Sequence, residues 1–331
     1  MFTPIVRLFQ VSRLRFVAVL FGTTVCLLAG NASMRAKANP RMPAPIDAQV
    51  SLASNPSIML GEPIVLRYKI ANATDSQGVG IGLGTYNTQW CRLSLTDAEG
   101  QSAQVIPDNR PLNPSGLHST GTSFLRPDGS QEDQLVVTRF FRVLRPGKYT
   151  LNVHVQIPYV ATTITEESSL NSDLESDIKA NNKVLTDDFV FPLTITQAVP
   201  SRLEAKANSL RQVAMAEKGG RNYKVSLDAL FSMPEAQAAS SWKSLANNAN
   251  EMDAELVADH LARIHSVTTV NLLVQMLDNP KLSPDQTSYI RAKIDESYNA
   301  GDVTVKGHIK ALAASRGGTM PETVPIPQPS D

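Results

Sequence analysis

The sequence has few of the residues that carry metal, redox or nucleophilic chemistry. It contains 2 cysteines and 5 histidines among 331 residues. Cys26 lies in an apolar N-terminal stretch, which leaves Cys91 as the single cysteine of the remaining chain. That part can form no internal disulfide, and one thiol cannot build a structural zinc site. Because Cys91 shares a strand face with Leu93 and Leu95, we expect a buried side chain rather than a reactive thiol.

The sequence also lacks an excess of positive or of negative charge. The chain has 31 basic and 31 acidic residues. Five of the basic residues and none of the acidic ones lie within 1–38, so the rest of the chain is mildly acidic. Binding to nucleic acid needs clustered lysine and arginine. We therefore expect no nucleic-acid partner.

The sequence shows no clear membrane-spanning run. The apolar run 16–30 is shorter than the roughly 20 residues of a spanning helix. It follows several arginines and precedes small residues at Ala36 and Ala38. This order predicts a secretory signal peptide, 1–38, whose removal leaves Asn39 as the first residue, and hence a periplasmic or secreted protein. The alternative is an uncleaved segment that anchors the protein in a membrane through 16–30.

Alternating apolar and polar residues dominate the chain from about residue 46 to residue 197. The alternating apolar positions are Ile64, Leu66, Tyr68 and Ile70, then Tyr149, Leu151, Val153, Val155 and Ile157, and finally Phe189, Phe191, Leu193 and Ile195. Further strands are expected near 47–53, 79–84, 90–96, 102–106 and 134–144. Seven or eight short strands without a helical period between them predict an antiparallel β-sandwich over 47–199, after a linker at 39–46.

Two segments of this region resemble bacterial extracellular immunoglobulin-like domains. They are 60–64 (Leu-Gly-Glu-Pro-Ile) and 145–151 (Arg-Pro-Gly-Lys-Tyr-Thr-Leu), each at the start of an expected strand. Tyr149, after a Pro-Gly turn, resembles the tyrosine corner of such sandwiches. Leu151 stands where antibody-type domains have a cysteine, so the resemblance is to the broad sandwich fold and not to an antibody-type domain.

Between Pro200 and about Gly317 the apolar residues recur with a period of 3.6 residues, which predicts six or seven short helices. Capping boxes are expected at Ser201, Ser232 and Ser283. Two similar segments, Leu-Phe-Ser-Met starting at residue 230 and Leu-Val-Gln-Met starting at residue 273, give a spacing similar to that of HEAT-like repeats. A plain helical bundle is the alternative for this domain, 200–317. The proline-rich tail, 318–331, is expected to be extended.

Several patterns in the sequence resemble metal or cofactor sites, but none of them contains all the residues that such a site requires. His260 and His265 are five residues apart, so on a helix they point roughly 140° apart, and we expect two partly exposed side chains that share no ion. The acids at 173–177 have calcium-loop spacing without the required glycine and glutamate. The alternating glycines at 78–84 fit a strand with a bare face, with Trp90 as a plausible packing partner. We expect no metal and no cofactor.

These observations favour a mixed chain with a mainly-β half followed by an all-α half, and a non-catalytic binding or scaffold function through protein–protein contacts. The candidate partner contacts are Trp242, Tyr289 and Tyr298, since aromatic side chains often anchor interfaces. The alternative is that Trp242 and Tyr289 are core residues. Two further functions stay open: an exported inhibitor or regulator of an enzyme that uses the loop 107–133, and a hydrolase whose site is assembled from distant residues.

Overall fold

The structure is a computed structural model, and all of its described residues belong to one compact unit, residues 32–331. The described residues are 34–35, 44–82, 90–106, 122–162, 177–178, 180, 183–251 and 253–316. Several sequence predictions therefore lie outside them. These are the signal peptide apart from Met34–Arg35, its cleavage site at Ala36, Ala38 and Asn39, the acids Asp173 and Glu175, the first part of the 107–133 loop, and the C-terminal tail.

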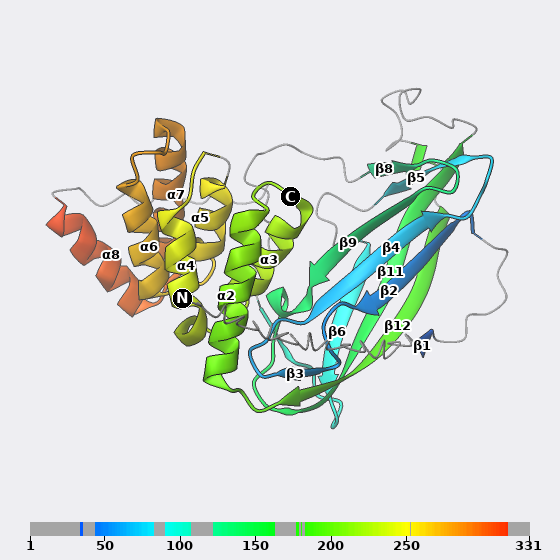
Figure 1. The fold of residues 1–331 in the computed structure, drawn as a ribbon, viewed down its shortest axis with the longest axis horizontal. Coiled ribbons are helices and arrows are strands. Elements are labelled where there is room, and N and C mark those ends of the chain that lie inside the picture. The colour runs from blue at the N-terminus through cyan, green and yellow to red at the C-terminus, as the bar shows by residue number, and fades with distance from the viewer. Residues whose placement is uncertain are drawn as a thin grey trace, which may run out of the picture. The chain divides into compact units, whose positions relative to one another are not determined.

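The described strands form three sheets (Figure 1). A seven-stranded sheet contains β1 (Met34–Arg35), β3 (Ser57–Met59), β5 (Gly78–Gly82), β6 (Cys91–Asp97), β8 (Thr122–Leu125), β11 (Gly147–Thr162) and β12 (Lys183–Thr196). A three-stranded sheet has the order β2 (Ile46–Leu52), β4 (Val65–Asn72) and β9 (Ser130–Val136). A two-stranded sheet pairs β7 (Gln104–Val105) with β10 (Phe141–Arg142).

Strand alternation explains why these sheets pack together. Along β4, β11 and β12 the apolar positions named from the sequence are buried and their neighbours are less so, as a period of two requires. The buried side chains of both larger sheets form one hydrophobic core, and apart from the parallel β3–β12 pair all strand pairings are antiparallel. The predicted β-sandwich is confirmed.

Two local predictions within the sandwich, those for Tyr149 and Cys91, are confirmed. The hydroxyl of Tyr149 donates a 2.9 Å hydrogen bond to the carbonyl of Arg145, which is the geometry of a tyrosine corner. Cys91 is buried as a free thiol, and burial raises its pKa to about 12. Trp90 belongs to the core and packs against Tyr68, with ring centroids 4.6 Å apart. Its expected packing against the glycine strand stays a prediction, because the nearest side chains at Gly82 are those of Ile178 and Pro158.

One expected strand, 134–144, is interrupted in the structure. β9 ends at Val136, a short 3-10 helix η1 covers Val137–Arg139, and β10 begins at Phe141. The turn is fixed by hydrogen bonds rather than by local pattern, because the N–H of Val137 donates to the carbonyl of Ile64 at 2.8 Å. This interruption turns the polar side chains of η1 toward the helices.

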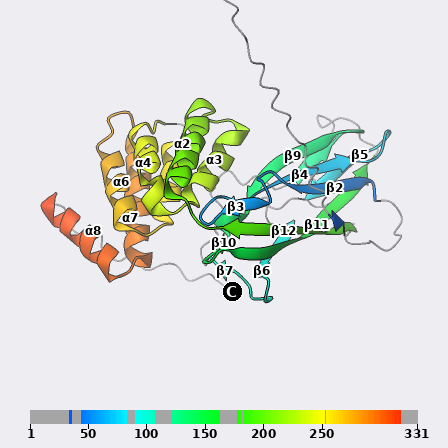
Figure 2. The ribbon, with the colours of Figure 1, turned by 60° about the horizontal axis from the view of Figure 1, so that its bottom comes forward.

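Seven α-helices follow the sandwich within the described residues. They are α2 (Pro200–Ala216), α3 (Arg221–Phe231), α4 (Glu235–Asn247), α5 (Ala254–Ala262), α6 (Val267–Leu277), α7 (Pro284–Ala300) and α8 (Val303–Ser315). The apolar faces of α2–α7 form a second core, to which β3 contributes Met59, and α8 packs through a smaller cluster with α6. Figure 2 shows β3 at the side of the sandwich next to these helices. The two segments that suggested a HEAT-like repeat lie at the end of α3 and inside α6, and the repeat stays a prediction.

Two of the three expected capping boxes are wrong. α2 begins at Pro200 with Val199 as its N-cap, so Ser201 lies inside the first turn. Ser232 does not cap α4, whose N-cap is Pro234. The box at Ser283 is confirmed, because its hydroxyl accepts from the N–H of Gln286. In α2 and in α4 a proline fixes the backbone angle φ where the helix starts, so neither helix begins at the serine that was expected to cap it.

Candidate functional site

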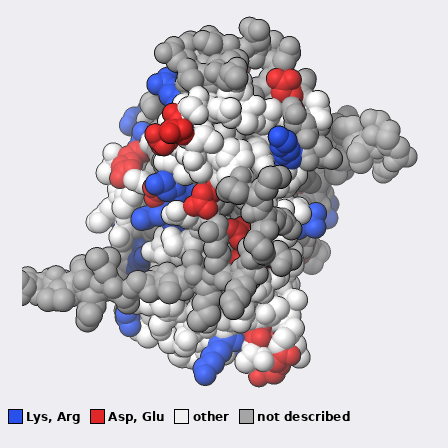
Figure 3. All heavy atoms as spheres, turned by 90° about the vertical axis from the view of Figure 1, so that its right-hand side faces the viewer, with Lys and Arg blue, Asp and Glu red and all other residues white. Residues whose placement is uncertain are grey.

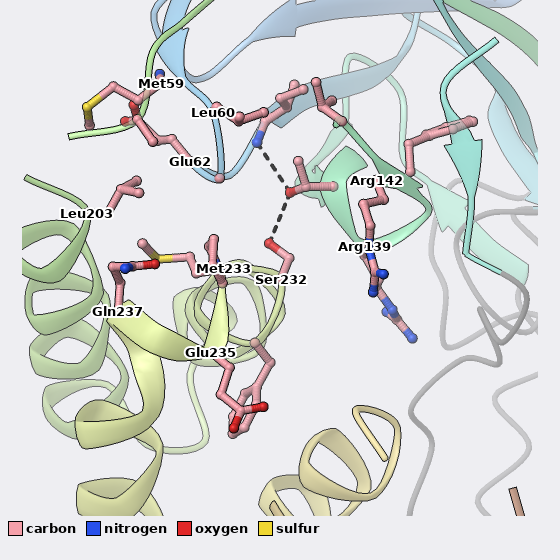
Figure 4. A pocket seen from close by; sticks show the side chains of 18 of the residues that line it. Met59, Leu60, Glu62, Arg139, Arg142, Leu203, Ser232, Met233, Glu235 and Gln237 are labelled. Atoms are coloured by element: carbon pink, nitrogen blue, oxygen red, sulfur yellow. Dashed lines mark hydrogen bonds between the residues drawn. The ribbon is translucent and has the colours of Figure 1, made fainter. Parts of the chain in front are cut away.

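A pocket of about 680 Å³ lies where the sandwich meets α2–α5, and we call it the junction pocket. Its volume falls in the range of roughly 300–1,000 Å³ that is typical of ligand sites. Figure 4 shows side chains of the β3–β4 turn (Met59, Leu60, Glu62) facing Met233 and Gln237 of the helical half, with Arg139 beside them. Both halves of the described chain therefore build this pocket.

The turn between β3 and β4 holds one wall in place. The N–H of Glu62 donates to the carbonyl of Met59 at 2.9 Å, and Gly61 has a φ of +88°, a region that favours glycine. A carboxylate oxygen of Glu62 accepts the N–H of Met59 at 3.1 Å. A Cβ on Gly61 would lie 2.7 Å from the ring of Pro234. Only glycine therefore allows the turn to approach the helical half this closely.

Polar contacts fasten η1 to α3 across the same junction. The hydroxyl of Thr138 accepts the N–H of Ile64 at 3.3 Å and lies 3.0 Å from the hydroxyl of Ser232 (Figure 4). Arg139 donates to the carboxylate of Asp228 at 3.3 Å, with about a fifth of each side chain exposed. These contacts bring a guanidinium of the sandwich and a carboxylate of the helices to the pocket.

His260 of α5 lies beside this ion pair and is 5% exposed. Its ring stacks on Phe231 at 4.8 Å between centroids, and Phe231 in turn stacks on Trp242 at 5.4 Å. The Nε2 atom of His260 is 3.6 Å from Oδ1 of Asp228, which is too long for a hydrogen bond. Among the described residues, neither of these two buried atoms has a hydrogen-bond partner. Each of the two atoms exposes less than 1 Å² of surface, so each is an unsatisfied buried polar group rather than an open binding position.

The two charged groups that shift the pKa of His260 are both positive. Burial, followed by the positive charges of Arg139 and Arg263, holds the pKa of His260 well below its ordinary range. Burial raises the pKa of Asp228, although Arg139, Arg263 and Lys224 oppose that shift. At neutral pH we therefore expect a neutral imidazole close to two guanidinium groups.

Other buried charged groups of the helical half do have partners within the chain. Asp253 accepts from Lys218 at 2.8 Å, and Asp259 accepts from Lys293 at 2.8 Å and from the hydroxyl of Tyr289 at 2.7 Å. These contacts satisfy buried carboxylates in the usual way. The exposed pair His154–Asp188, at 2.6 Å, lies on the outer face of the sandwich and lines no pocket described here.

One exposed apolar side chain lines the junction pocket, and two others are next in the chain to residues that line it. Five large hydrophobic residues are exposed in the described parts of the chain: Val105, Leu144, Val184, Val199 and Val303. Leu144 lines the pocket, Val105 precedes the lining residue Ile106, and Val199 lies between two lining residues. We call Val105, Leu144 and Val199 the apolar rim. Exposed apolar surface gathered at one place marks a binding surface more often than scattered residues do.

The sequence-derived contact residues fall in different places. Trp242 is 1% exposed and lies at the inner wall of the junction pocket, which favours its interpretation as a core residue. Tyr289 and Tyr298 are half-buried and are not among the residues that line the pocket. The expectation that His260 is partly exposed is wrong, because α5 is buried on nearly all sides. His265 is half-buried beyond the end of α5.

Sequence reasoning missed Arg139 and Asp228 as site residues. No local motif contains them, because residues 139, 228 and 260 meet only in the folded chain. The described residues contain no cluster of three or more histidine, cysteine or acidic side chains that could hold a metal ion. Within the same residues, no helix combines the length and apolar character that would let it cross a bilayer. Figure 3 shows acidic and basic side chains interspersed on the described surface of one side of the molecule.

Comparisons with known proteins give a weak likeness to one kind of fold. No protein-family model and no curated protein matches the chain. Among solved structures, it is similar to PapD-like domain 7 of human CEP192, with 12% identity and a TM-score of 0.25 over 50% of this chain and 98% of that one. Northeast Structural Genomics Consortium target SoR45 matches at 13% identity and a TM-score of 0.21, over 47% and 90% of the chains. No function is transferred from these proteins.

Proposed function

We propose that the protein is an exported, non-catalytic binding protein that takes up an apolar segment of a partner protein in the junction pocket. The observation that carries this proposal is that Leu144, an exposed apolar side chain, lines the pocket, while Val105 and Val199 are exposed next to other lining residues in the chain. An apolar cavity alone suits a small molecule, whereas an exposed apolar border offers further contact to an extended partner.

The construction of the walls also supports binding. Each wall is held by hydrogen bonds or by close backbone approach, as Gly61 against Pro234 and Thr138 beside Ser232 illustrate. A preformed site loses less conformational entropy when a partner binds. Export rests on the predicted signal peptide. Its cleavage would remove β1, which pairs only with Phe189 and Val190 of β12, far along that strand from the pocket residue Ile195.

The test is capture by a variant of the rim. We would immobilise the exported chain, expose it to native cell-envelope extract, and quantify bound proteins by mass spectrometry. Leu144→Asp places a charge on the pocket rim at a side chain that is 63% exposed, so folding should be unaffected. The matched control is Val303→Asp, at an exposed valine outside the pocket.

We expect a specific partner to be captured by the wild-type chain and by Val303→Asp, and to be lost with Leu144→Asp. Benzoylphenylalanine placed at Leu144 should form a photo-crosslink to the same partner, whereas placement at Val303 should not. Equal capture by all three proteins, with no crosslink from position 144, would show that the junction pocket is not the binding surface.

A further inference from the structure

We infer that the open edge of β12, residues 184–190, is a second binding surface, which adds an extended basic segment of a partner protein as an antiparallel strand after the predicted signal peptide has been removed. The inference rests on the cleavage that the proposed function includes, but not on the junction pocket. It is carried by the strand pairing of β1 and by the direction in which the backbone of β12 presents its hydrogen-bonding groups.

β12 lies at a border of the seven-stranded sheet. One side of it pairs with β11 along almost its whole length, from Lys183 to Ile195. On the other side, within the described parts of the chain, β3 pairs only with residues 194–196 and β1 only with residues 189–190. Figure 1 shows β1 beside β12 at this border of the sandwich. The described chain therefore leaves most of residues 184–190 without a neighbouring strand on this side.

The backbone of β12 shows which of its residues face this edge. The N–H of Thr194 donates to the carbonyl of Pro56 at 2.8 Å, and the carbonyl of Thr196 accepts the N–H of Leu60 at 2.9 Å. Backbone groups alternate between the two sides of a strand, and the register with β11 is continuous, so even-numbered residues of β12 face the edge. Pro192 agrees with this, because a strand tolerates proline where its nitrogen faces no ladder. The residues of the open edge that present backbone groups outward are therefore Val184, Thr186, Asp188 and Val190.

β1 already uses this edge as a partner strand would. Met34 pairs with Val190 and Arg35 with Phe189, in antiparallel register. Both residues of β1 lie within the predicted signal peptide, so cleavage after Ala38 would remove them and open the edge. An open edge presents unpaired N–H and C=O groups, which are a template for another strand. The pairing of β1 is thus an example, within this chain, of the contact that we assign to the partner.

The charge of the edge favours a basic segment. Residues 184–190 include two acids and no lysine or arginine. Asp188 lies 2.6 Å from the ring of His154 but keeps 58% of its side chain exposed, and a carboxylate oxygen of Asp187 accepts the N–H of Asp188 at 3.1 Å. The segment of the sequence that contains β1 is basic, with Arg35 and Lys37. Opposite charges on neighbouring strands stabilise the pair.

A second copy of the chain suits this edge less well. Two β12 strands paired antiparallel around residues 187 and 188 would bring the acids of both copies together. Like charges opposite each other destabilise a strand pair. A basic segment of another protein has no such conflict, and it can form main-chain hydrogen bonds at Thr186 and at Val190, on both sides of the acids.

The test uses a synthetic peptide that corresponds to residues 31–38, acetylated and amidated at its ends, and the isotope-labelled exported chain. N-terminal sequencing first establishes that this chain begins at Asn39. During an NMR titration we expect saturable shifts of the backbone amide signals of Thr186 and Val190. The amide signals of β9, an outer strand of the three-stranded sheet, should stay in place.

Methylation of the peptide backbone distinguishes strand pairing from other contacts. The N–H of Met34 should face β12, because its partner Val190 faces the edge, whereas the N–H of Arg35 should face away. A methyl group on the nitrogen of Met34 should weaken binding about tenfold, the effect of one lost hydrogen bond. The same group on the nitrogen of Arg35 should weaken it much less. A peptide with Arg35→Glu and Lys37→Glu should also bind more weakly, because it carries the same charge as the edge.

Variants of the chain test the same contact from the other side. Val190→Pro removes the edge-facing N–H of this residue without removing a bond to β11, and Val190→Thr is the matched control that keeps the N–H. We expect the peptide to bind Val190→Thr but not Val190→Pro. Partner capture through the junction pocket should survive Val190→Pro, and peptide binding should survive Leu144→Asp, so failure of this inference and failure of the proposed function are distinguishable. If Val190→Pro does not fold, the two methylated peptides decide.

Several results would overturn the inference. One is an exported chain that still contains Met34, since β1 would then stay on the edge. Others are a peptide that does not bind, equal affinity of the two methylated peptides, and equal affinity of the basic and the glutamate peptides. Benzoylphenylalanine at Thr186 of the exported chain should crosslink to another protein, and a crosslinked product of two copies of this chain would show that the edge serves self-association instead.

Discussion

The sandwich and the helical half differ in how many polar residues they bury. Ten polar or charged residues are buried within the described parts of the chain. Two of them, Asn72 and Asp187, belong to the sandwich, and the others are Ser226, Ser241, Asp253, Asp259, His260, Thr269, Gln286 and Ser297 of the helical half. A strand sends alternate side chains to solvent, whereas a helix enclosed by neighbours buries most of its circumference.

This difference shows where to look for function. The helical half must satisfy many interior polar groups, and it does so with internal partners, such as the carbonyl of Glu251 for the side chain of Gln286 at 2.7 Å. Buried atoms of Tyr223, Asp228 and His260 depart from that rule within the described residues, and the last two lie near the surface shared with the sandwich. The following predictions test this contrast, from the largest expected effect to the smallest.

Removal of the aromatic stack should have the largest effect. Trp242→Ala deletes a side chain that is 1% exposed and stacks on Phe231. We expect the free energy of unfolding to fall by about 3–5 kcal/mol, as for other buried aromatic side chains. Urea unfolding measures the change. Tyr298→Ala, at a half-buried position, should cost clearly less, and an equal cost would mean that Trp242 is not a core residue.

The glycine at the junction should come next. Gly61→Ala imposes left-handed backbone strain and a clash with Pro234, so we expect a loss of roughly 1–3 kcal/mol. Gly100→Ala is the matched control, because Gly100 also has a positive φ, of +79°, but has nothing within 4 Å of the added Cβ. Both glycines have a positive φ, but only Gly61 would clash. Comparing the thermal unfolding of the two variants therefore separates the cost of backbone strain from the cost of the clash. Similar losses for the two would argue against close packing at the junction.

The buried histidine should make stability depend on pH. The pKa of His260 is lowered in the folded state, so the unfolded state takes up the proton first as the pH falls below the ordinary value of 6.5. This group should therefore reduce stability at low pH, by at most about 1.4 kcal/mol per pH unit. Arg139 of η1 and Arg263, the C-cap of α5, add to this effect through their positive charge.

The measurement compares urea unfolding of the wild type and His260→Gln between pH 7.5 and pH 5.5. The stability of the wild type relative to the variant should decline across this window. On α3, Lys224 influences the carboxyl of Asp228, whose raised pKa acts in the opposite direction at lower pH. His308→Gln is the control, because His308 is only half-buried and its ring lies beside Asn271. A constant difference between the wild type and His260→Gln would show that this histidine is not buried in its neutral form.

The smallest effect should come from the tyrosine corner. Tyr149→Phe removes the hydrogen bond to the carbonyl of Arg145 but keeps the buried ring. We expect a loss of about 0.5–1.5 kcal/mol, typical of one hydrogen bond, in chemical denaturation. Peptide binding to the junction pocket should be unchanged. A change in binding would mean that the two halves are coupled more strongly than their separate cores imply.

The fold was more predictable from the sequence than the site. Alternation predicted β4, β11 and β12 because a period of two is a local property that tertiary packing preserves. The break at η1 could not be predicted, since it depends on a hydrogen bond between Val137 and Ile64, which are distant in the sequence.

The site was missed for the same physical reason. The charged side of the pocket brings together Arg139 of η1, Asp228 of α3 and His260 of α5. None of these residues belongs to a recognisable motif in its own segment. His260 was expected to be partly exposed, because a helical period cannot show how many neighbours surround a helix. A signal was present in the high apolar content of α5, whose residues are nearly all buried.

The most direct test is NMR of the methionine methyl groups during titration with an apolar peptide, acetyl-Leu-Leu-Leu-amide. Met59 and Met233 line the junction pocket from the sandwich side and the helical side, whereas Met276 is a buried core residue outside the lining. If the pocket is the binding site, the signals of Met59 and Met233 should shift together and saturate, and Met276 should stay unchanged. Saturable binding that leaves the signals of Met59 and Met233 in place would contradict the account.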